Sequence, residues 1–297
     1  MSIRRLLSLL IASLCVAAPA TAQELTGTLK KVKESATLVM GIRESSLPLS
    51  YLDDKQQPVG YHIEICNRIA DAVKAQLKLQ SLKVQHQPVT SQNRIPLMTN
   101  GTIDIECGST TNSLDRQKQV AFAVTTFVTN VRMAVKKASG ITSLAQLGGK
   151  PVATTTGTTS VQLMRAHEKG KNLDFKEVYG KDHADSFLML ETDRAVAFVM
   201  DDNLLAGLIV NSKNPADYAI VGESLRQEPI AIMLRKDDAP FKKVADDTIM
   251  AMMKSGELEK LYEKWFTKPI PPKGVNLAFP MSAETKEAIK NPNDKGI

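Results

Sequence analysis

The chain has 297 residues, of which 43% are hydrophobic, and a formal net charge of +6 at pH 7. This length is large for one hydrophobic core and sufficient for two lobes. Lysine and arginine are interspersed with acidic residues and form no basic block with interleaved aromatics, so nucleic-acid binding is not expected.

Residues 1–22 have the pattern of a secretory signal peptide. Arg4 and Arg5 give a positive start, an apolar run follows, and residues 20–22 (ATA) fit a small-x-small cleavage site. A retained membrane anchor is the alternative, but the apolar run is shorter than the ~20 residues of a spanning helix. We therefore expect a mature chain that begins at Gln23 and carries a charge of +4 after Arg4 and Arg5 are removed.

The mature chain alternates expected strands and helices. In chain order, we expect a strand at 37–42, a helix at 60–79, a strand at 82–89, a short helix at 91–101 and a strand at 102–107. On the first helix, Ile65, Ile69, Val73 and Leu77 recur every four residues and indicate one buried face. This alternation is typical of an α/β fold with parallel sheets and crossover helices.

A second unit of similar plan follows. Its expected elements are a short helix at 143–149, strands at 150–157, 174–180, 194–200 and 218–223, and helices at 158–170, 183–193 and 201–210. The chain then ends in expected helices at 239–256, 257–266 and 282–291. Two such units predict two lobes.

Two extended segments, 126–135 and 227–235, are suited to link these lobes. We expect lobe 1 to comprise residues 23–127 plus 233–297 and lobe 2 to comprise residues 132–228. The hinge crossings are then 128–131 and 229–232, and a double crossover of this kind permits hinge motion.

Polar side chains follow four of the expected strands. They are Arg43, the pair Ser109 and Thr111, Thr159 at a helix start, and Asp201. Ligands of open α/β sheets bind beyond the carboxyl ends of the strands, where helix N-termini also favour a carboxylate. The four strand ends therefore predict one shared binding cleft.

The charges of the candidate residues indicate the kind of ligand. Arg43, Arg94, Arg116 and His183 favour anions, whereas Asp201 favours a cation. Several positive groups around one negative group suit an acidic amino acid. Each residue also has an ordinary structural interpretation, as a solvated arginine, a helix cap or a partly exposed histidine.

Cys66 and Cys107 remain after cleavage. An even pair in an oxidising compartment favours a disulfide, and two buried free thiols are the alternative. The cysteines lack the Cys/His spacing of a metal site, so neither a metal nor another cofactor is expected.

Eight motifs carry a family resemblance: GIRESSLPLSY, TSQNRIPLMTNGT, ECGSTTNSLDRQKQVAF, TTTGTTS, KDHADSF, AVAFVMDDNLLAG, MLRKDD and WFTKPIPPK. With them, nearly the whole mature chain resembles the periplasmic solute-binding proteins for polar amino acids that serve ABC importers, and most closely the glutamate/aspartate-binding members. The resemblance implies a two-lobed type II periplasmic-binding-protein fold, a periplasmic location, no catalysis, and membrane permease subunits as partners. A monomer is the default expectation.

The resemblance also implies roles for single residues. Arg116, helped by Thr111 and Thr159, would clamp the ligand's α-carboxylate, and Asp201 with Ser109 would accept its α-ammonium. Four residues would hold the side-chain carboxylate: Arg43, Ser91, Arg94 and His183. As a departure, His62 follows Gly60-Tyr61 where family members usually have an acidic residue, and we expect it to affect helix capping without loss of ligand binding.

Three alternatives remain open from the sequence. The chain could bind glutamine, asparagine or a dicarboxylate with the same fold. It could be a same-fold enzyme of the dehydratase kind, in which Asp201 and His183 would be the acid/base pair, although no supporting catalytic motif accompanies them. It could also be the input domain of a sensor, which would need a downstream signalling or membrane segment.

Overall fold

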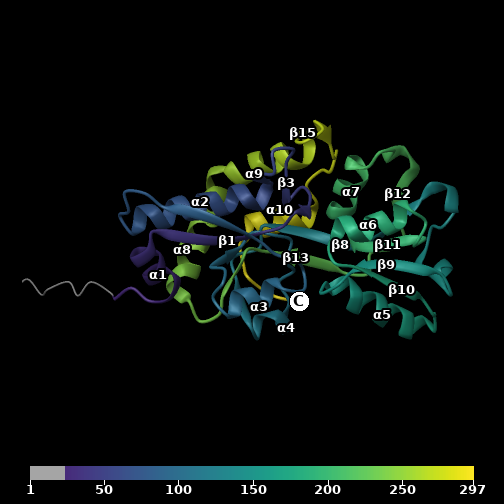
Figure 1. Ribbon diagram of the computed structural model, residues 1–297, viewed down its shortest axis with the longest axis horizontal. Coiled ribbons are helices and arrows are strands. Elements are labelled where there is room, and N and C mark those ends of the chain that lie inside the picture. Colours follow the sequence, from purple (N-terminus) through teal and green to yellow (C-terminus); the bar gives the residue numbers. More distant parts are fainter. Residues whose placement is uncertain (1–23) are drawn as a thin grey trace, which may run out of the picture.

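The computed structural model describes residues 24–297 and has two lobes, each built on its own sheet (Figure 1). In Figure 1 the first and last parts of the sequence, purple to blue and yellow, form the left-hand lobe, and the teal to green middle forms the right-hand lobe. The predicted signal peptide, residues 1–22, lies outside the described residues. Across residues 24–297, no helix combines the length and apolar character needed to cross a membrane.

Lobe 1 is built on a five-stranded sheet. Its strands, in spatial order, are β5 (Lys83–Pro88), β1 (Thr37–Ile42), β6 (Ile105–Glu106), β14 (Met233–Arg235) and β7 (Val120–Phe122). β1 is parallel to β5 and β6, whereas β14 runs antiparallel between β6 and β7. The sheet is therefore mainly parallel, as predicted, and the carboxyl ends of β1, β5 and β6 lie at one edge.

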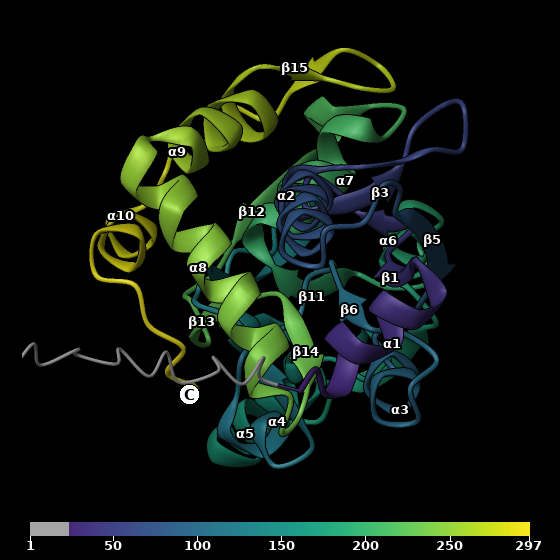
Figure 2. The ribbon, with the colours of Figure 1, turned by 90° about the vertical axis from the view of Figure 1, so that its left-hand side faces the viewer.

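Seven helices of the described chain belong to lobe 1. They are α1 (Gly27–Ser35), α2 (Tyr61–Gln76), α3 (Arg94–Thr99), α4 (Leu114–Gln117), α8 (Ala239–Ser255), α9 (Glu257–Tyr262) and α10 (Ala283–Lys290). Figure 2, which looks onto the end of this lobe, shows α8 running past α1 and α2, and α8 contacts both of them. A π-helical turn, Glu263–Thr267, continues α9.

Lobe 2 is built on a six-stranded sheet. Its strands are β10 (Lys176–Gly180), β9 (Pro151–Thr155), β11 (Ala197–Asp201), β8 (Phe127–Lys136) and β12 (Tyr218–Val221), with β13 (Gln227–Ile230) paired to the start of β8. β10, β9 and β11 are parallel, and β8 is antiparallel to β11 and β12. Its helices are α5 (Thr159–Lys171), α6 (His183–Glu191) and α7 (Asp202–Asn211).

Strands β8 and β13 connect the two lobes. They pair antiparallel over Phe127–Asn130 and Gln227–Ile230, so the outgoing and returning chains lie side by side. Phe127, at the start of β8, stacks on Phe266 of the π-helical turn with a centroid separation of 5.1 Å, which anchors the crossing in lobe 1. Rotation of the lobes about 128–131 and 229–232 remains a prediction.

Two local differences from the predicted elements have physical reasons. The strand expected at 102–107 shortens to β6, because the Asp104 carboxylate accepts a hydrogen bond from Val39 N at 2.9 Å in place of a regular strand pairing. Helix α1 is not predicted from the sequence, because it buries only Leu29 and Val32 as apolar side chains and shows too little periodicity.

Several short strands between 45 and 59 and near the C-terminus are also missed by the sequence analysis. They form the three-stranded sheet β2 (Ser45–Ser46), β3 (Ser50–Leu52) and β4 (Pro58–Val59), and the pair β15 (Pro269–Ile270) and β16 (Val275–Asn276). Strands of two or three residues are too short for alternation to identify them.

Helix α2 is tied to the segment after β6 in two ways. The structure joins Cys66 on α2 to Cys107 in a disulfide. His62, in the first turn of α2, is fully buried, with its ring contacting the carbonyl oxygen of Gly108 and, at 2.8 Å, Thr126 Oγ1. The effect of His62 is therefore not limited to helix capping, because its ring holds α2 to the segment after β6. Burial lowers the pKa of His62 to about 4, so the ring is neutral at neutral pH.

The disulfide gives a stability prediction. Cys66→Ala with Cys107→Ala removes a crosslink between residues 41 apart in sequence, and should lower the free energy of unfolding by about 2–4 kcal/mol. Urea unfolding followed by circular dichroism measures the change. Equal midpoints for the variant and the unreduced wild type would contradict a formed disulfide.

Candidate ligand-binding site

The predicted site residues lie where strands end and helices begin. Arg43 directly follows β1, Ser91 lies between β5 and α3, and Asp201 is the last residue of β11. Arg94, Thr159 and His183 are the first residues of α3, α5 and α6. Ser109 and Thr111 follow β6, and Arg116 lies in α4, where Ser113 caps the helix by accepting from Arg116 N.

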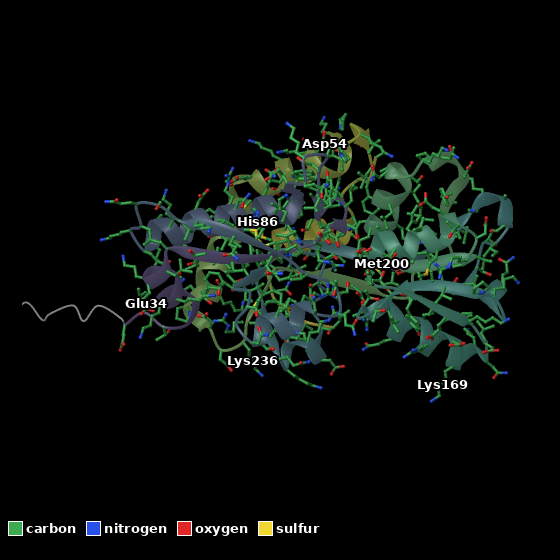
Figure 3. The ribbon with its side chains drawn as sticks, in the orientation of Figure 1. Glu34, Asp54, His86, Lys169, Met200 and Lys236 are labelled. Carbon is green, nitrogen blue, oxygen red and sulfur yellow. A yellow bond between two sulfur atoms is a disulfide. The ribbon has the colours of Figure 1, made fainter. Side chains whose placement is uncertain are left out.

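Eight of the nine predicted residues line one small cavity between the lobes, with a volume of about 10 Å³. They are Ser91, Arg94, Ser109, Thr111, Arg116, Thr159, His183 and Asp201, joined by Thr158 and Met200. Figure 3 shows Met200 near the junction of the lobes, whereas Lys169 and Lys236 project from the surface. The ninth residue, Arg43, lies behind the wall and contacts Ser109 Oγ at 3.3 Å.

Contacts across the cavity hold the lobes together in a closed arrangement. Arg43 Nη2 of lobe 1 lies 3.3 Å from His183 Nε2 of lobe 2, and Arg116 Nη2 donates to the Gly157 carbonyl at 3.4 Å. At Gly157 an added Cβ would lie 2.7 Å from Gln92 Cα, so only glycine allows this approach of the two backbones. The cavity is thus formed by both lobes at once.

The three arginines of the site are almost completely buried. Arg43 and Arg94 are 1% and 2% exposed. Desolvation lowers the pKa of Arg43 to about 10 and that of Arg116 to about 9, with the Arg94 charge adding to the shift in each case. The guanidinium groups remain charged at neutral pH, and buried charge is unfavourable unless it is paired. The site therefore favours an anion.

His183 is neutral and held in one tautomer. Burial lowers its pKa well below the usual value, and the charges of Arg43 and Arg94 lower it further. Since arginine has no acceptor, Arg43 Nη2 donates to His183 Nε2, which leaves the ring proton on Nδ1 to be donated to Thr155 Oγ1 at 3.0 Å. His183 therefore adds no positive charge, contrary to its place among the anion-favouring groups of the sequence analysis.

Two buried carboxylates at the site were missed from the sequence. Glu106 in β6 is fully buried; its Oε2 accepts from Thr110 Oγ1 at 2.7 Å, and its Oε1 has no hydrogen-bond partner within residues 24–297. Glu228 in β13 is also fully buried. Glu106 interrupts an apolar strand, and a charged residue within such a strand is the signal that could have identified it. Glu228 follows the polar residues Arg226 and Gln227, so the sequence gives no such signal for it.

Two polar atoms of the cavity wall lack protein partners. Ser91 Oγ and Arg94 Nε are buried and make no hydrogen bond to any residue of the described chain. Buried polar groups are nearly always hydrogen-bonded, so these atoms favour a polar ligand. Among the lining residues Arg94 and Arg116 are positive and Asp201 is negative when ionised, which then leaves one net positive charge. Within the described part of the chain, no group of three His, Cys, Asp or Glu side chains is placed to hold a metal ion.

Asp201 has a raised pKa in the empty site. Desolvation is the main cause, and the charges of Glu228 and Asp202 add to it, while Arg94 and Arg116 oppose it. A cationic group of a ligand beside Asp201 would favour the ionised carboxylate and lower this pKa.

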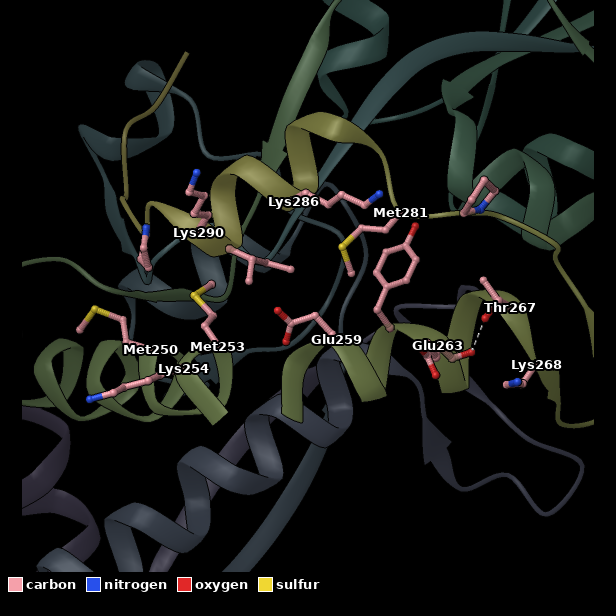
Figure 4. Close-up of a pocket in the computed structure, with 14 residues that line it drawn as sticks. Met250, Met253, Lys254, Glu259, Glu263, Thr267, Lys268, Met281, Lys286 and Lys290 are labelled. Atoms are coloured by element: carbon pink, nitrogen blue, oxygen red, sulfur yellow. Dashed lines mark hydrogen bonds between the residues drawn. The ribbon is translucent and has the colours of Figure 1, made fainter. Parts of the chain in front are cut away.

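A larger groove lies elsewhere, between α8–α9 and α10 of lobe 1 (Figure 4). It has a volume of about 970 Å³, and its walls include Met253, Met281, Lys286 and Lys290. All of its lining residues fall within 250–292, so it contains none of the residues that follow the strands of the two main sheets. The convergent polar groups lie in the small cavity.

Two sheet-based lobes joined by two extended crossings, with a polar cavity between them, define the type II periplasmic-binding-protein fold. The chain belongs to the bacterial extracellular solute-binding proteins, family 3, which matches residues 38–268.

Relatives with assigned names support this membership. The chain is 49% identical over 291 residues to the L-glutamate/L-aspartate-binding protein of Pseudomonas aeruginosa, covering 98% of this chain and 96% of that protein. It is 48% identical over 270 residues to the glutamate/aspartate import solute-binding protein of Escherichia coli, covering 91% and 89%. These relatives are named as binding and import proteins, not as enzymes.

A solved structure bears on the enzyme alternative. The ancestral amino acid-binding protein AncCDT-1, a precursor of cyclohexadienyl dehydratase, matches with a TM-score of 0.70 and 27% identity, over 81% of this chain and 100% of that chain. The fold is thus shared by a binding protein and the enzyme lineage that followed it, so the site residues must decide the function.

Proposed function

We propose that this protein binds an acidic amino acid, glutamate or aspartate, in the cavity between its lobes and delivers it to an ABC importer. The main support for this proposal is the closed cavity lined by Arg94, Arg116 and Asp201, whose net positive charge complements a ligand with two carboxylates and one ammonium. The names of relatives at 48–49% identity support the same ligand class.

The proposed roles follow the charges. Arg116 binds the α-carboxylate, because two of its five N–H groups are used on Thr111 O and Gly157 O and the rest are available. Asp201 and Ser109 bind the α-ammonium. Arg94 and Ser91 bind the side-chain carboxylate beside His183, with Arg43 supporting them from behind.

These contacts are sufficient for useful affinity. A hydrogen bond to a charged group contributes about 1.5–3 kcal/mol, and micromolar binding needs about 8 kcal/mol. A handful of such bonds meets this requirement even after the costs of closure and desolvation.

Binding is coupled to closure in this proposal. Residues 23–127 plus 233–297 and residues 132–228 act as lobes that rotate about 128–131 and 229–232, as periplasmic binding proteins do. Residues 1–22 direct export to the periplasm, where the closed monomer meets the permease subunits of the transporter.

Calorimetric titration of Arg94→Ala tests the ligand class. The wild type should bind L-glutamate or L-aspartate more tightly than L-glutamine. Arg94→Ala should weaken glutamate about 10- to 100-fold and glutamine much less, because the lost bonds are to the side-chain carboxylate. Arg165→Ala, on the exposed face of lobe 2, is the matched control. Equal losses for both ligands would refute the side-chain assignment, and a wild type that binds neither acidic amino acid would refute the function.

Binding should release a proton near Asp201. Because the pKa of Asp201 is raised in the empty site and an ammonium lowers it, glutamate affinity should fall about tenfold per pH unit below the raised pKa. Calorimetry in buffers of different ionisation enthalpy measures the released proton. Glutarate, which lacks the ammonium, should release none; release of a proton by glutarate as well would assign the effect to another group.

Closure can be blocked at one glycine. Gly207 on α7 of lobe 2 faces lobe 1, where an added Cβ would lie 2.4 Å from the Leu47 carbonyl oxygen. Gly207→Ala should therefore weaken glutamate at least tenfold while leaving the ligand-free protein equally or more stable, since alanine favours a helix by about 1 kcal/mol over glycine.

Gly170→Ala is the control for this variant, because Gly170 is also helical and an added Cβ there meets nothing within 4 Å. Calorimetry and thermal unfolding of both variants provide the comparison. Wild-type affinity in Gly207→Ala would show that ligand binding does not need the close approach of α7 to Leu47.

A further inference from the structure

Glu228 occupies an unusual position at the crossing between the lobes. It lies on β13, opposite Thr129 of β8, and is fully buried. Its Oε1 accepts two bonds from Arg226, at 2.6 Å from Nη2 and 3.1 Å from Nε. Oε1 is thus occupied by the guanidinium of Arg226, and Oε2 remains as a second acceptor.

The other oxygen of Glu228 accepts a hydrogen bond from one hydroxyl group of each lobe. Oε2 accepts from Thr111 Oγ1 of lobe 1 at 2.6 Å and from Thr159 Oγ1 of lobe 2 at 2.7 Å. The two hydroxyl oxygens lie 3.5 Å apart, and both residues line the cavity. A shared acceptor of this kind is complete only when the lobes are closed.

These bonds determine what the threonines can offer a ligand. A hydroxyl has a single hydrogen, and both hydrogens are donated to Glu228. The oxygens of Thr111 and Thr159 therefore present only lone pairs to the cavity. They can accept from an ammonium, whereas they cannot donate to a carboxylate, which is the role that the family resemblance implies for them.

We propose that Glu228 is a positioning residue that fixes Thr111 and Thr159 as hydrogen-bond acceptors, so that with Asp201 they form a subsite for the ligand's ammonium that is complete only in the closed protein. Arg116 is then the side chain that remains to donate to the α-carboxylate. This inference rests on the proposed function, and it makes a free amino group, in addition to two carboxylates, a requirement for tight binding.

Glu228→Gln tests this orientation. Arg226 needs an acceptor, so the amide oxygen of the variant should face Arg226 and its NH2 group should face the threonines. The threonine hydroxyls would then accept hydrogen bonds from the amide and turn their hydrogens into the cavity. Hydrogens that point into the cavity repel an ammonium group and cannot accept its hydrogen bonds. A purely structural role for Glu228 would instead weaken all ligands by a similar factor.

The measurement compares L-glutamate with glutarate, which has the same two carboxylates without the amino group. Competition against labelled L-glutamate, followed by equilibrium dialysis, gives both dissociation constants in each variant. We expect Glu228→Gln to reduce the preference for glutamate over glutarate at least tenfold. Glu106→Gln is the matched control, because it removes another buried negative charge near the arginines without contacting Thr111 or Thr159. Its change of preference measures the effect of a lost negative charge alone, and it should be much smaller than the change in Glu228→Gln.

The outcomes separate the two proposals. Loss of affinity by the same factor for both ligands in Glu228→Gln, or an equal change of preference in Glu106→Gln, would overturn the role of Glu228 while leaving the proposed function intact. A wild type that does not bind glutamate would overturn the proposed function itself. Should Glu228→Gln fail to fold, Thr159→Val serves as the second variant, because it removes one acceptor and should also weaken glutamate more than glutarate.

Discussion

The burial of three guanidinium groups between two lobes is the constraint on which the rest of the site depends. Arg43, Arg94 and Arg116 keep their charge although solvent barely reaches them. Glu106 is close enough to raise the pKa of each of the three, and so partly compensates them. Neutral His183 avoids adding to the charge. What remains is an excess of positive charge in a cavity that only closure completes, and an anionic solute supplies the missing compensation.

The same constraint explains why polar contacts and lobe geometry are linked. The arginines of lobe 1 reach acceptors on lobe 2, as in the contact of Arg43 with His183 and that of Arg116 with Gly157. The disulfide between Cys66 and Cys107 and the buried ring of His62 hold α2 to the segment that follows β6. That segment carries Ser109 and Thr111. The contacts that hold it within lobe 1 do not depend on closure, whereas its contacts with lobe 2 form only in the closed protein.

Much of this arrangement follows from the sequence, because strand ends in an α/β sheet are where ligands bind. The sequence assigns Arg43, Thr159 and Asp201 to one cleft from their places after strands and His183 from its charge, and the family resemblance adds Ser91. The short strand β6 could not be predicted, since the Asp104 side chain replaces a backbone pairing there. The sequence alone left the pairing of the two cysteines open, because it does not show how close α2 lies to the segment after β6.

The compensating carboxylates were harder to predict for a different reason. Glu106 lies among apolar strand residues and Glu228 follows a polar residue, Gln227. Their partners, Thr110 for Glu106 and Arg226 with two threonines for Glu228, become apparent only in the folded chain. The direction of a hydroxyl hydrogen is likewise set by its partners. The carboxylate-binding role expected of Thr111 and Thr159 therefore depends on Glu228, whose place beside them is not evident from the sequence.

A crystal structure of the protein grown with L-glutamate tests the central claim most directly. The account predicts one glutamate between the lobes, with its α-carboxylate on Arg116, its ammonium on Asp201 and its side-chain carboxylate on Arg94. Glutamate found outside this cavity, or arginines that turn to bulk solvent while the ligand contacts neither Arg94 nor Arg116, would contradict it.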